Sequence, residues 1–339
     1  MAKNKYNYDL LFEKIAPDLG AADITFANLE TPVDHTAAGS GYPAFNARLE
    51  LLTALKKAGV DVVSLANNHA RDAGAGGLLR TLKNVEKAGL VVVGAGRTRV
   101  ESLAPAYLSS QGVITAFLAY TYSTNNGLPK KRKGVPAVNL LRSGSREDLA
   151  AAVIQIQEAR SHADLVVVSL HWGDEYRLAP TPWQKQAAVE LVEAGADIIL
   201  GHHPHVLQPV ESHKTKDGRQ TVIAYSLGNF ISSQNYGVSF RNKKHARALR
   251  GDGVILMVYA EKEQGRTAIV GTAFEPTWSL REKAGVATVF RPVSLSREIK
   301  RASAMKKLSK KEEDTLQLLT YRQKVILDTI RTAPAVTGP

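Results

Sequence analysis

A short apolar run that begins at an Ala-Asp or Val-Asp step recurs four times along this chain of 339 residues. The runs are rich in β-branched residues, and helix-like segments such as 147–160 and 183–194 precede them. Strands that alternate with helices predict βα units and a mainly parallel sheet. The strands are continuously apolar, which predicts that both faces of this sheet are buried. The four runs occupy residues 22–26, 60–64, 163–168 and 196–200.

Further strand-like runs follow, and the later ones have no long helices between them. They lie at residues 91–93, 113–119, 221–226, 254–260 and 267–274. We therefore expect a second, more antiparallel sheet packed on the first, with helices outside, in an α/β fold. Ser309 and Glu312 form the pattern of a capping box ahead of an amphipathic run that reaches Ile330. The expected organisation is one layered domain over 1–295, a helical extension over 296–331 and a disordered tail over 332–339.

Composition limits both the ligand chemistry and the partners. The chain has no cysteine, which leaves His, Asp, Glu and Asn side chains as the metal ligands to consider. Lys and Arg outnumber Asp and Glu by 44 to 32, and the resulting net charge of +12 favours anionic partners. Basic residues cluster at 130–133, 241–250 and 297–311. Aromatic residues do not interleave with these clusters in the sequence, so nucleic acid is an unlikely partner.

The sequence contains no apolar stretch long enough to cross a membrane. No uninterrupted apolar run reaches eighteen residues, and residues 1–9 are too polar for a signal peptide. We therefore expect any membrane association to come from a segment absent from this chain.

Polar residues that can bind metal or transfer protons follow five of the strand-like runs. Open α/β sheets bind ligands beyond the carboxyl ends of their strands, so these side chains are expected to converge. Taken alone, each of them has an ordinary structural explanation, for example in a turn or a loop. Their joint occurrence at five strand ends favours a functional site. The residues are Asn28 and Glu30, Asn67, Asn68, His69 and Asp72, His171 and Glu175, His202, His203 and His205, and Asn229.

The strongest single signal is the segment His202-His203-Pro204-His205. Three imidazoles within four residues, stiffened by a proline, suit a borderline-soft metal such as Mn, Fe or Zn. A carboxylate could bridge two such divalent ions and lower the pKa of a water molecule between them. A histidine that is not a ligand, such as His69 oriented by Asp72, could protonate a leaving group.

Five ordered motifs resemble the CapA (poly-γ-glutamate capsule biosynthesis) family, a branch of the calcineurin-like metallophosphoesterases. They lie at residues 27–32, 64–69, 169–173, 201–206 and 225–230, and weaker matches include Tyr122 with Asn125. The resemblance covers about residues 6 to 280. It implies a four-layer αββα sandwich and a centre with two divalent metal ions.

The resemblance also implies a role for each site residue. Glu30 stands where a bridging carboxylate sits, Asn68 where an amide ligand sits, and His69 where the acid for the leaving group sits. His171 corresponds to a ligand of one ion, while His203 and His205 divide between the two. His202 competes with His203 for this position. The residues expected to support the ligands or face the substrate are Asn28, Asn67, Glu175, His202 and Asn229.

The chain departs from the family pattern at its start. Family members begin with a strand that ends in a metal-binding Gly-Asp, and no Gly-Asp precedes Asp9 here. Gly251-Asp252 comes too late in the order to take that place. We therefore expect the first strand to be missing, through truncation or divergence, and a second ion is less expected without this aspartate.

Three functions follow from the residues and the resemblance. The first is a phosphoesterase-type hydrolase that attacks an anionic cell-surface substrate with metal-activated water. The second is a component of a capsule-assembly system that binds or transfers poly-γ-glutamate without catalysis, and the third is a metal-dependent amide hydrolase. The expected partners are an anionic polymer or phosphate ester and other capsule-assembly proteins. The resemblance implies an extracytoplasmic location at the cell surface.

Overall fold

The computed structural model describes residues 7–127, 135–285 and 287–331. The basic cluster at 130–133 and the tail predicted at 332–339 lie outside these residues. Within the described ranges, no helix combines the length and the hydropathy that a bilayer-spanning helix needs.

The first two layers are a small parallel sheet and the helices that cover it. Strands β1 (Phe26–Asn28), β2 (Val62–Ser64) and β3 (Val91–Val93) pair in parallel in that order. Apolar side chains of helices α3 (Leu49–Lys57) and α4 (Gly74–Lys87) are buried in the same cluster as those of these strands. Because helices cover one face of this sheet and a second sheet covers the other, its strands are apolar up to the polar residues Asn28 and Ser64 that end β1 and β2.

A six-stranded sheet forms the third layer, with the order β10-β11-β9-β8-β6-β5. Strands β6, β8, β9 and β11 are parallel, whereas β5 and β10 are antiparallel edge strands. The bounds of the strands are β5 (Ala106–Ser110), β6 (Val113–Thr121), β8 (Leu165–His171), β9 (Ile198–His202), β10 (Val210–Lys214) and β11 (Gln220–Ala224).

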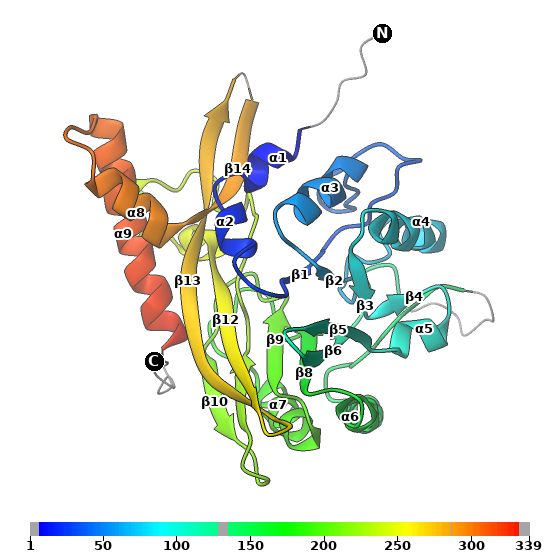
Figure 1. Cartoon of the computed structure of the whole chain (residues 1–339). Helices are drawn as coiled ribbons and strands as arrows, with labels where there is room; N and C mark the ends of the chain where they lie inside the picture. Colours follow the sequence, from blue (N-terminus) through cyan, green and yellow to red (C-terminus); the bar gives the residue numbers. More distant parts are fainter. Residues whose placement is uncertain (1–6, 128–134, 286, 332–339) are drawn as a thin grey trace.

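The side chains of this sheet alternate between two cores. Val167 lies in the cluster shared with the small sheet, whereas Val166 and Val168 pack with the helices on the opposite face. Those helices are α6 (Arg146–Arg160) and α7 (Pro182–Ala194), which form the fourth layer. Figure 1 shows α3 and α4 on one side of the two sheets and α6 and α7 on the other. The predicted αββα sandwich is therefore confirmed.

The four Ala-Asp or Val-Asp strands do not share one sheet, contrary to our expectation. The first two are β1 and β2 of the small sheet, and the last two are β8 and β9 of the large sheet. An apolar strand buried on both faces looks the same in either sheet, so the sequence pattern could not assign the pairing. The run at 221–226, which we grouped with the later antiparallel strands, forms β11 and pairs in parallel with β9.

A third, antiparallel sheet packs beside the sandwich. It consists of the long strands β12 (Asp252–Glu263), β13 (Arg266–Ala284) and β14 (Ala287–Ser294). Helices α8 (Leu295–Ser303) and α9 (Lys310–Ile330) lie along its outer side (Figure 1). The predicted capping box of Ser309 and Glu312 begins α9. The domain boundary at 295 stays a prediction, although α8 begins there.

The remaining elements are short and connect the layers. They are α1 (Asp9–Phe12), α2 (Ala16–Leu19), β4 (Ala95–Gly96), α5 (Arg99–Leu103), β7 (Ala137–Val138) and the 3₁₀ helices η1 (Phe240–Asn242) and η2 (Ala246–Gly251).

A buried ion pair fastens α9 to the start of β12. Arg322 and Asp252 are each 2% exposed, and Arg322 Nε donates to Asp252 Oδ1 over 2.9 Å. A second hydrogen bond joins Arg322 Nη2 to Asp252 Oδ2. The carboxylate of the Gly251-Asp252 step therefore serves the attachment of this helix.

Arg322→Ala should lower the free energy of unfolding by about 3–5 kcal/mol, because it leaves the Asp252 carboxylate buried without a counter-charge. Urea titration followed by circular dichroism measures this change. Lys324→Ala is the matched control, since its ion pair with Asp328 is exposed, and it should change stability by less than about 0.5 kcal/mol. Equal effects of the two substitutions would contradict the structural role of the buried pair.

Candidate metal centre

The loop that carries the histidine cluster leaves β9 through a tightly packed glycine. A Cβ atom at Gly201 would lie 1.9 Å from the backbone oxygen of Tyr225, so no other residue fits there. Beyond it, His203 and His205 adopt positive φ angles of 98° and 56°. Such angles are uncommon for residues other than glycine and tend to occur at functional sites.

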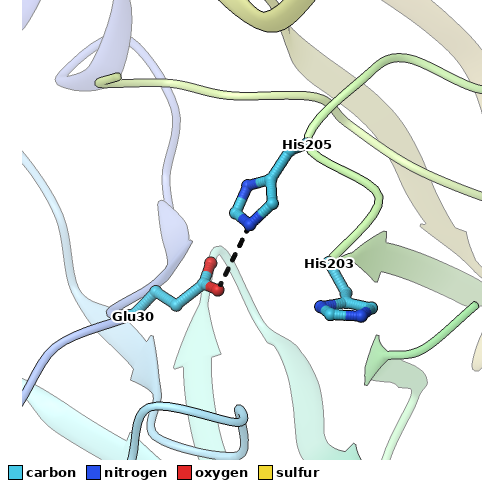
Figure 2. Close-up of side chains that lie close together, drawn as sticks. All are labelled: Glu30, His203 and His205. Atoms are coloured by element: carbon cyan, nitrogen blue, oxygen red, sulfur yellow. Dashed lines mark ion pairs between the residues drawn. The ribbon is translucent and has the colours of Figure 1, made fainter. Parts of the chain in front are cut away.

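The structure brings a carboxylate from one sheet to the histidines of the other. Glu30, His203 and His205 each offer a donor atom, and these atoms lie within 4.8 Å of one another. Glu30 Oε1 is 3.9 Å from His205 Nε2, and Figure 2 shows both groups directed toward each other with His203 beside them. Glu30 follows β1 and the histidines follow β9, so the centre lies where the ends of the two sheets meet.

His171 and Asn68 complete the cluster of predicted ligands. His171 Nε2 lies 2.9 Å from Asn68 Oδ1 and 3.5 Å from Glu30 Oε1. The ring centroids of His171 and His203 are 4.9 Å apart. All five residues predicted as ligands therefore meet in one place, although their roles at a metal stay predictions.

Several buried nitrogen and oxygen atoms of this cluster have no hydrogen-bond partner in the described structure. They include Glu30 Oε1 and the Nδ1 atoms of His171 and His203, and Nε2 of the neighbouring His202 is also unpaired. Buried polar atoms are rarely left unpaired in folded proteins, so a group of them in one place calls for a ligand. The carboxylate and imidazole donors fit a divalent transition metal.

The electrostatics of the centre also suit a cation. Burial lowers the pKa of His203 to about 4 and that of His171 well below the usual range, so both imidazoles are neutral near pH 7. Neutral imidazole is the state that binds metals. Burial also raises the pKa of Glu30, and the nearby negative charges of Glu175 and Asp72 add to this effect.

Three asparagines hold the predicted ligands in place. Asn28 Nδ2 donates to Glu30 Oε2 over 3.3 Å, and Asn67 Nδ2 donates to Asn28 Oδ1 over 3.1 Å. These bonds occupy one carboxylate oxygen and leave the other free. Asn229 Oδ1 lies 2.9 Å from His205 Nδ1, while its Nδ2 donates to the backbone oxygens of His205 and Arg250. His205 Nδ1–H therefore donates to Asn229, and the lone pair of Nε2 is directed toward Glu30.

Asn229→Ala should weaken metal binding by about 10–100-fold, because it removes the group that sets the tautomer and orientation of His205. Titration with Mn²⁺ or Zn²⁺ in a calorimeter measures the affinity. Asn235→Ala is a suitable control, since Asn235 is also buried but donates to Ser279 O in another part of the chain. An Asn229→Ala variant with the affinity of the unmodified chain would contradict this role.

His69 and Asp72 form a pair beside the centre. His69 Nδ1 is 2.6 Å from Asp72 Oδ2, which leaves Nε2 of the imidazole available. Asp72 also accepts a hydrogen bond from Phe45 N, and the Phe45 ring packs edge-on against His69 at 4.5 Å between centroids. A turn brings the two residues together, and α4 begins only at Gly74.

The structure places His202 and His203, the two candidates for one ligand position, in different surroundings. His202, the last residue of β9, lies against Phe26 with 6.2 Å between ring centroids, whereas His203 lies against His171 and Tyr122. His203 follows the end of β9 and has a φ angle of 98°, and the two neighbouring rings therefore contact different groups. Glu175 is exposed, and its charge helps to raise the pKa of Tyr122, to which burial contributes most.

Two residues near the centre were not singled out as site residues in the sequence. Phe45 gives no sequence signal, because it lies in a loop and reaches His69 only through the tertiary fold. Asn125 accepts a hydrogen bond from Asn68 Nδ2 over 3.3 Å and thereby turns the Asn68 oxygen toward His171. Its place in a segment that resembles the family could have identified it.

Comparisons with known proteins agree with these motifs. The capsule biosynthesis protein CapA of Bacillus anthracis is 36% identical over 244 residues, which cover 69% of this chain and 56% of the relative. The PGA biosynthesis protein CapA of Bacillus subtilis (strain 168) is 37% identical over 235 residues, or 67% of this chain and 58% of the relative. The chain thus spans little more than half the length of these relatives. The crystal structure of the calcineurin-like phosphoesterase YfkN from Bacillus subtilis aligns with 83% of this chain and 75% of its own, at 13% identity and a TM-score of 0.37.

The family of this chain is identified from the sequence matches alone. The family model described as bacterial capsule synthesis protein PGA_cap matches residues 1–234, more than half of the chain. The resemblance to CapA seen in the five motifs is confirmed. This chain belongs to the PGA_cap family of bacterial capsule synthesis proteins.

Proposed function

We propose that this chain carries the site of a metal-dependent hydrolase that acts on an anionic polymer during capsule synthesis. The observation that supports it most is that ligand atoms of Glu30, His203 and His205 lie within 4.8 Å of one another, beside buried atoms such as Glu30 Oε1 that have no hydrogen-bond partner. A protein that only needed a stable core would not collect such atoms in one place, because each lowers stability unless a ligand binds it.

The residues of the centre divide into two groups with different tasks. Glu30, Asn68, His171, His203 and His205 would hold a divalent ion, which, when bound, would supply Lewis-acid activation of water and substrate. His69 stands outside this set with its Nδ1 held by Asp72. It would donate a proton from Nε2 to the leaving group. The neutral, buried imidazoles of His171 and His203 would limit the access of bulk water to the centre.

A test of the proposal combines metal analysis with activity. The purified chain is reconstituted with Mn, Fe or Zn, its metal content is measured, and it is assayed with a generic phosphodiester and with a γ-glutamyl amide. Metal binding with hydrolysis of either substrate supports the hydrolase and identifies the bond that is cleaved. Absence of metal and of turnover would overturn it.

A second candidate is a chain that binds or transfers poly-γ-glutamate without hydrolysis. It is favoured by the scarcity of carboxylates at the centre, where Glu30 is the one acidic member of the described cluster. Asp252 of the Gly251-Asp252 step is paired with Arg322. With a single carboxylate, one ion is a better match to the donors than two. Binding of the polymer without turnover in the same assays would favour this candidate.

We also propose a location and partners for this chain. Relatives named for capsule or PGA biosynthesis support a place outside the cytoplasm, together with other capsule-assembly proteins. Export of the chain by its native host, followed by protease accessibility on intact cells, tests this placement.

A further inference from the structure

We propose that Arg247 and Arg250, held on the rings of Tyr236 and Tyr176, form a binding track that guides a carboxylate-bearing polymer to the metal centre. The proposal rests on the proposed function, because it names the substrate class of the same site. Arg247 and Arg250 belong to η2, in one of the basic clusters that the sequence contains.

Arg250 lies at the edge of the centre. Its guanidinium carbon is 3.9 Å from the centroid of the Tyr176 ring, and that ring is 6.2 Å from the ring of His205. Hydrogen bonds connect both residues to the surroundings of the centre. Tyr176 N donates to Pro204 O in the histidine loop, and Asn229 Nδ2 donates to Arg250 O. One aromatic ring therefore separates this guanidinium from a predicted metal ligand.

Arg247 continues the positive surface away from the centre. Its guanidinium carbon lies 4.3 Å from the centroid of the ring of Tyr236, a residue that is 56% exposed. Residues three apart in a 3₁₀ helix lie above one another, with a rise of about 6 Å over the three residues. Arg247 and Arg250 therefore line the same face of η2, and the tyrosine rings restrict both guanidinium groups at little further cost in entropy.

These two arginines differ from the other arginines that the fold holds in place. Arg160, Arg219 and Arg322 are all paired with aspartates at less than 4 Å. In the described residues, no carboxylate lies within that distance of the Arg247 or Arg250 side chain. Ring stacking leaves the N–H groups at the guanidinium edges free, and these edges bind carboxylates in a bidentate manner.

The arrangement favours a carboxylate polymer over nucleic acid. Proteins that bind single-stranded nucleic acid stack its bases on free aromatic faces. Here guanidinium groups already cover a face of Tyr176 and of Tyr236, and what they offer is a row of positive charges. A polymer with one carboxylate on each residue, such as poly-γ-glutamate, could place successive carboxylates on Arg247 and Arg250 while its chain reaches the centre.

The test compares two double variants of the full chain that remove the same charge. Arg247→Gln with Arg250→Gln alters the track, and Lys306→Gln with Lys307→Gln removes two exposed charges beyond α8 as a control. Binding of fluorescently labelled poly-γ-glutamate is followed by anisotropy at physiological ionic strength, and metal content is measured in parallel. We expect the dissociation constant of the track variant to rise by at least about tenfold, which is roughly the effect of losing one charge-assisted hydrogen bond. In the control variant it should rise by less than about twofold.

Three results would overturn the proposal. They are equal weakening in the two double variants, no weakening in either, and displacement of the polymer by a single-stranded oligonucleotide at the same concentration of charges. The metal content of the track variant should equal that of the unmodified chain, because neither arginine is a predicted ligand. Polymer binding can be measured whether or not the centre hydrolyses anything, so failure of the hydrolase is distinguishable from failure of the track.

Discussion

His171→Ala should remove bound metal almost completely, with a loss of affinity greater than about 100-fold. Loss of a group that merely orients a ligand already costs about 10–100-fold, and His171 would itself be a ligand. Its Nε2 faces both Asn68 Oδ1 and Glu30 Oε1, so no neighbouring side chain can replace it from the same position. Elemental analysis after reconstitution and desalting measures the effect, and His203→Ala should behave in the same way.

The matched control for these variants is His202→Ala. His202 is paired directly with His171 across β8 and β9, and it is a partly buried imidazole whose pKa burial lowers to about 4. Because its ring lies against Phe26, its removal should leave the metal content unchanged. Circular dichroism of all three variants checks that the fold is retained. Full metal content in His171→Ala or His203→Ala would exclude that residue as a ligand.

His69→Ala should keep the metal and lower kcat by about 100–10,000-fold, the range that a general acid contributes. The imidazole is held by Asp72 through Nδ1, outside the set of predicted ligands, so its removal leaves the donor atoms of the centre in place. Hydrolysis of phosphodiesters with leaving groups of different pKa measures the effect. A substrate whose leaving group needs no proton should lose much less activity in this variant.

Asp72→Asn removes the negative charge beside the imidazole of His69. Asp72 Oδ2 accepts from Phe45 N and contacts His69 Nδ1, and an amide oxygen in its place could keep both contacts but would stabilise a protonated imidazole less. This variant should therefore lie between the unmodified chain and His69→Ala in kcat, again with full metal content. Loss of metal from His69→Ala would mean that His69 is a ligand, and an unchanged kcat would exclude it as the acid.

Local sequence patterns predicted much of the fold. The apolar β-branched runs became β1, β2, β8 and β9, and the Ser309–Glu312 pattern became the first turn of α9. They did so because strand burial and helix capping depend on residues close together in the chain. The sheet to which a strand belongs does not depend on neighbouring residues. Packing between distant segments put β1 and β2 in one sheet and β8 and β9 in another.

Local sequence was enough to identify the residues that could bind a cation, because these polar groups directly follow buried strands and so gather where those strands end. It also determined the family, through five motifs in a fixed order. Only tertiary packing brings Glu30, which follows a strand of the small sheet, to the histidines that follow β9 of the large sheet. Packing also places His203 rather than His202 in the cluster and pairs Asp252 with Arg322. It also placed Arg250 on Tyr176, since contacts between residues 74 positions apart depend on how the layers pack and leave no trace in local spacing.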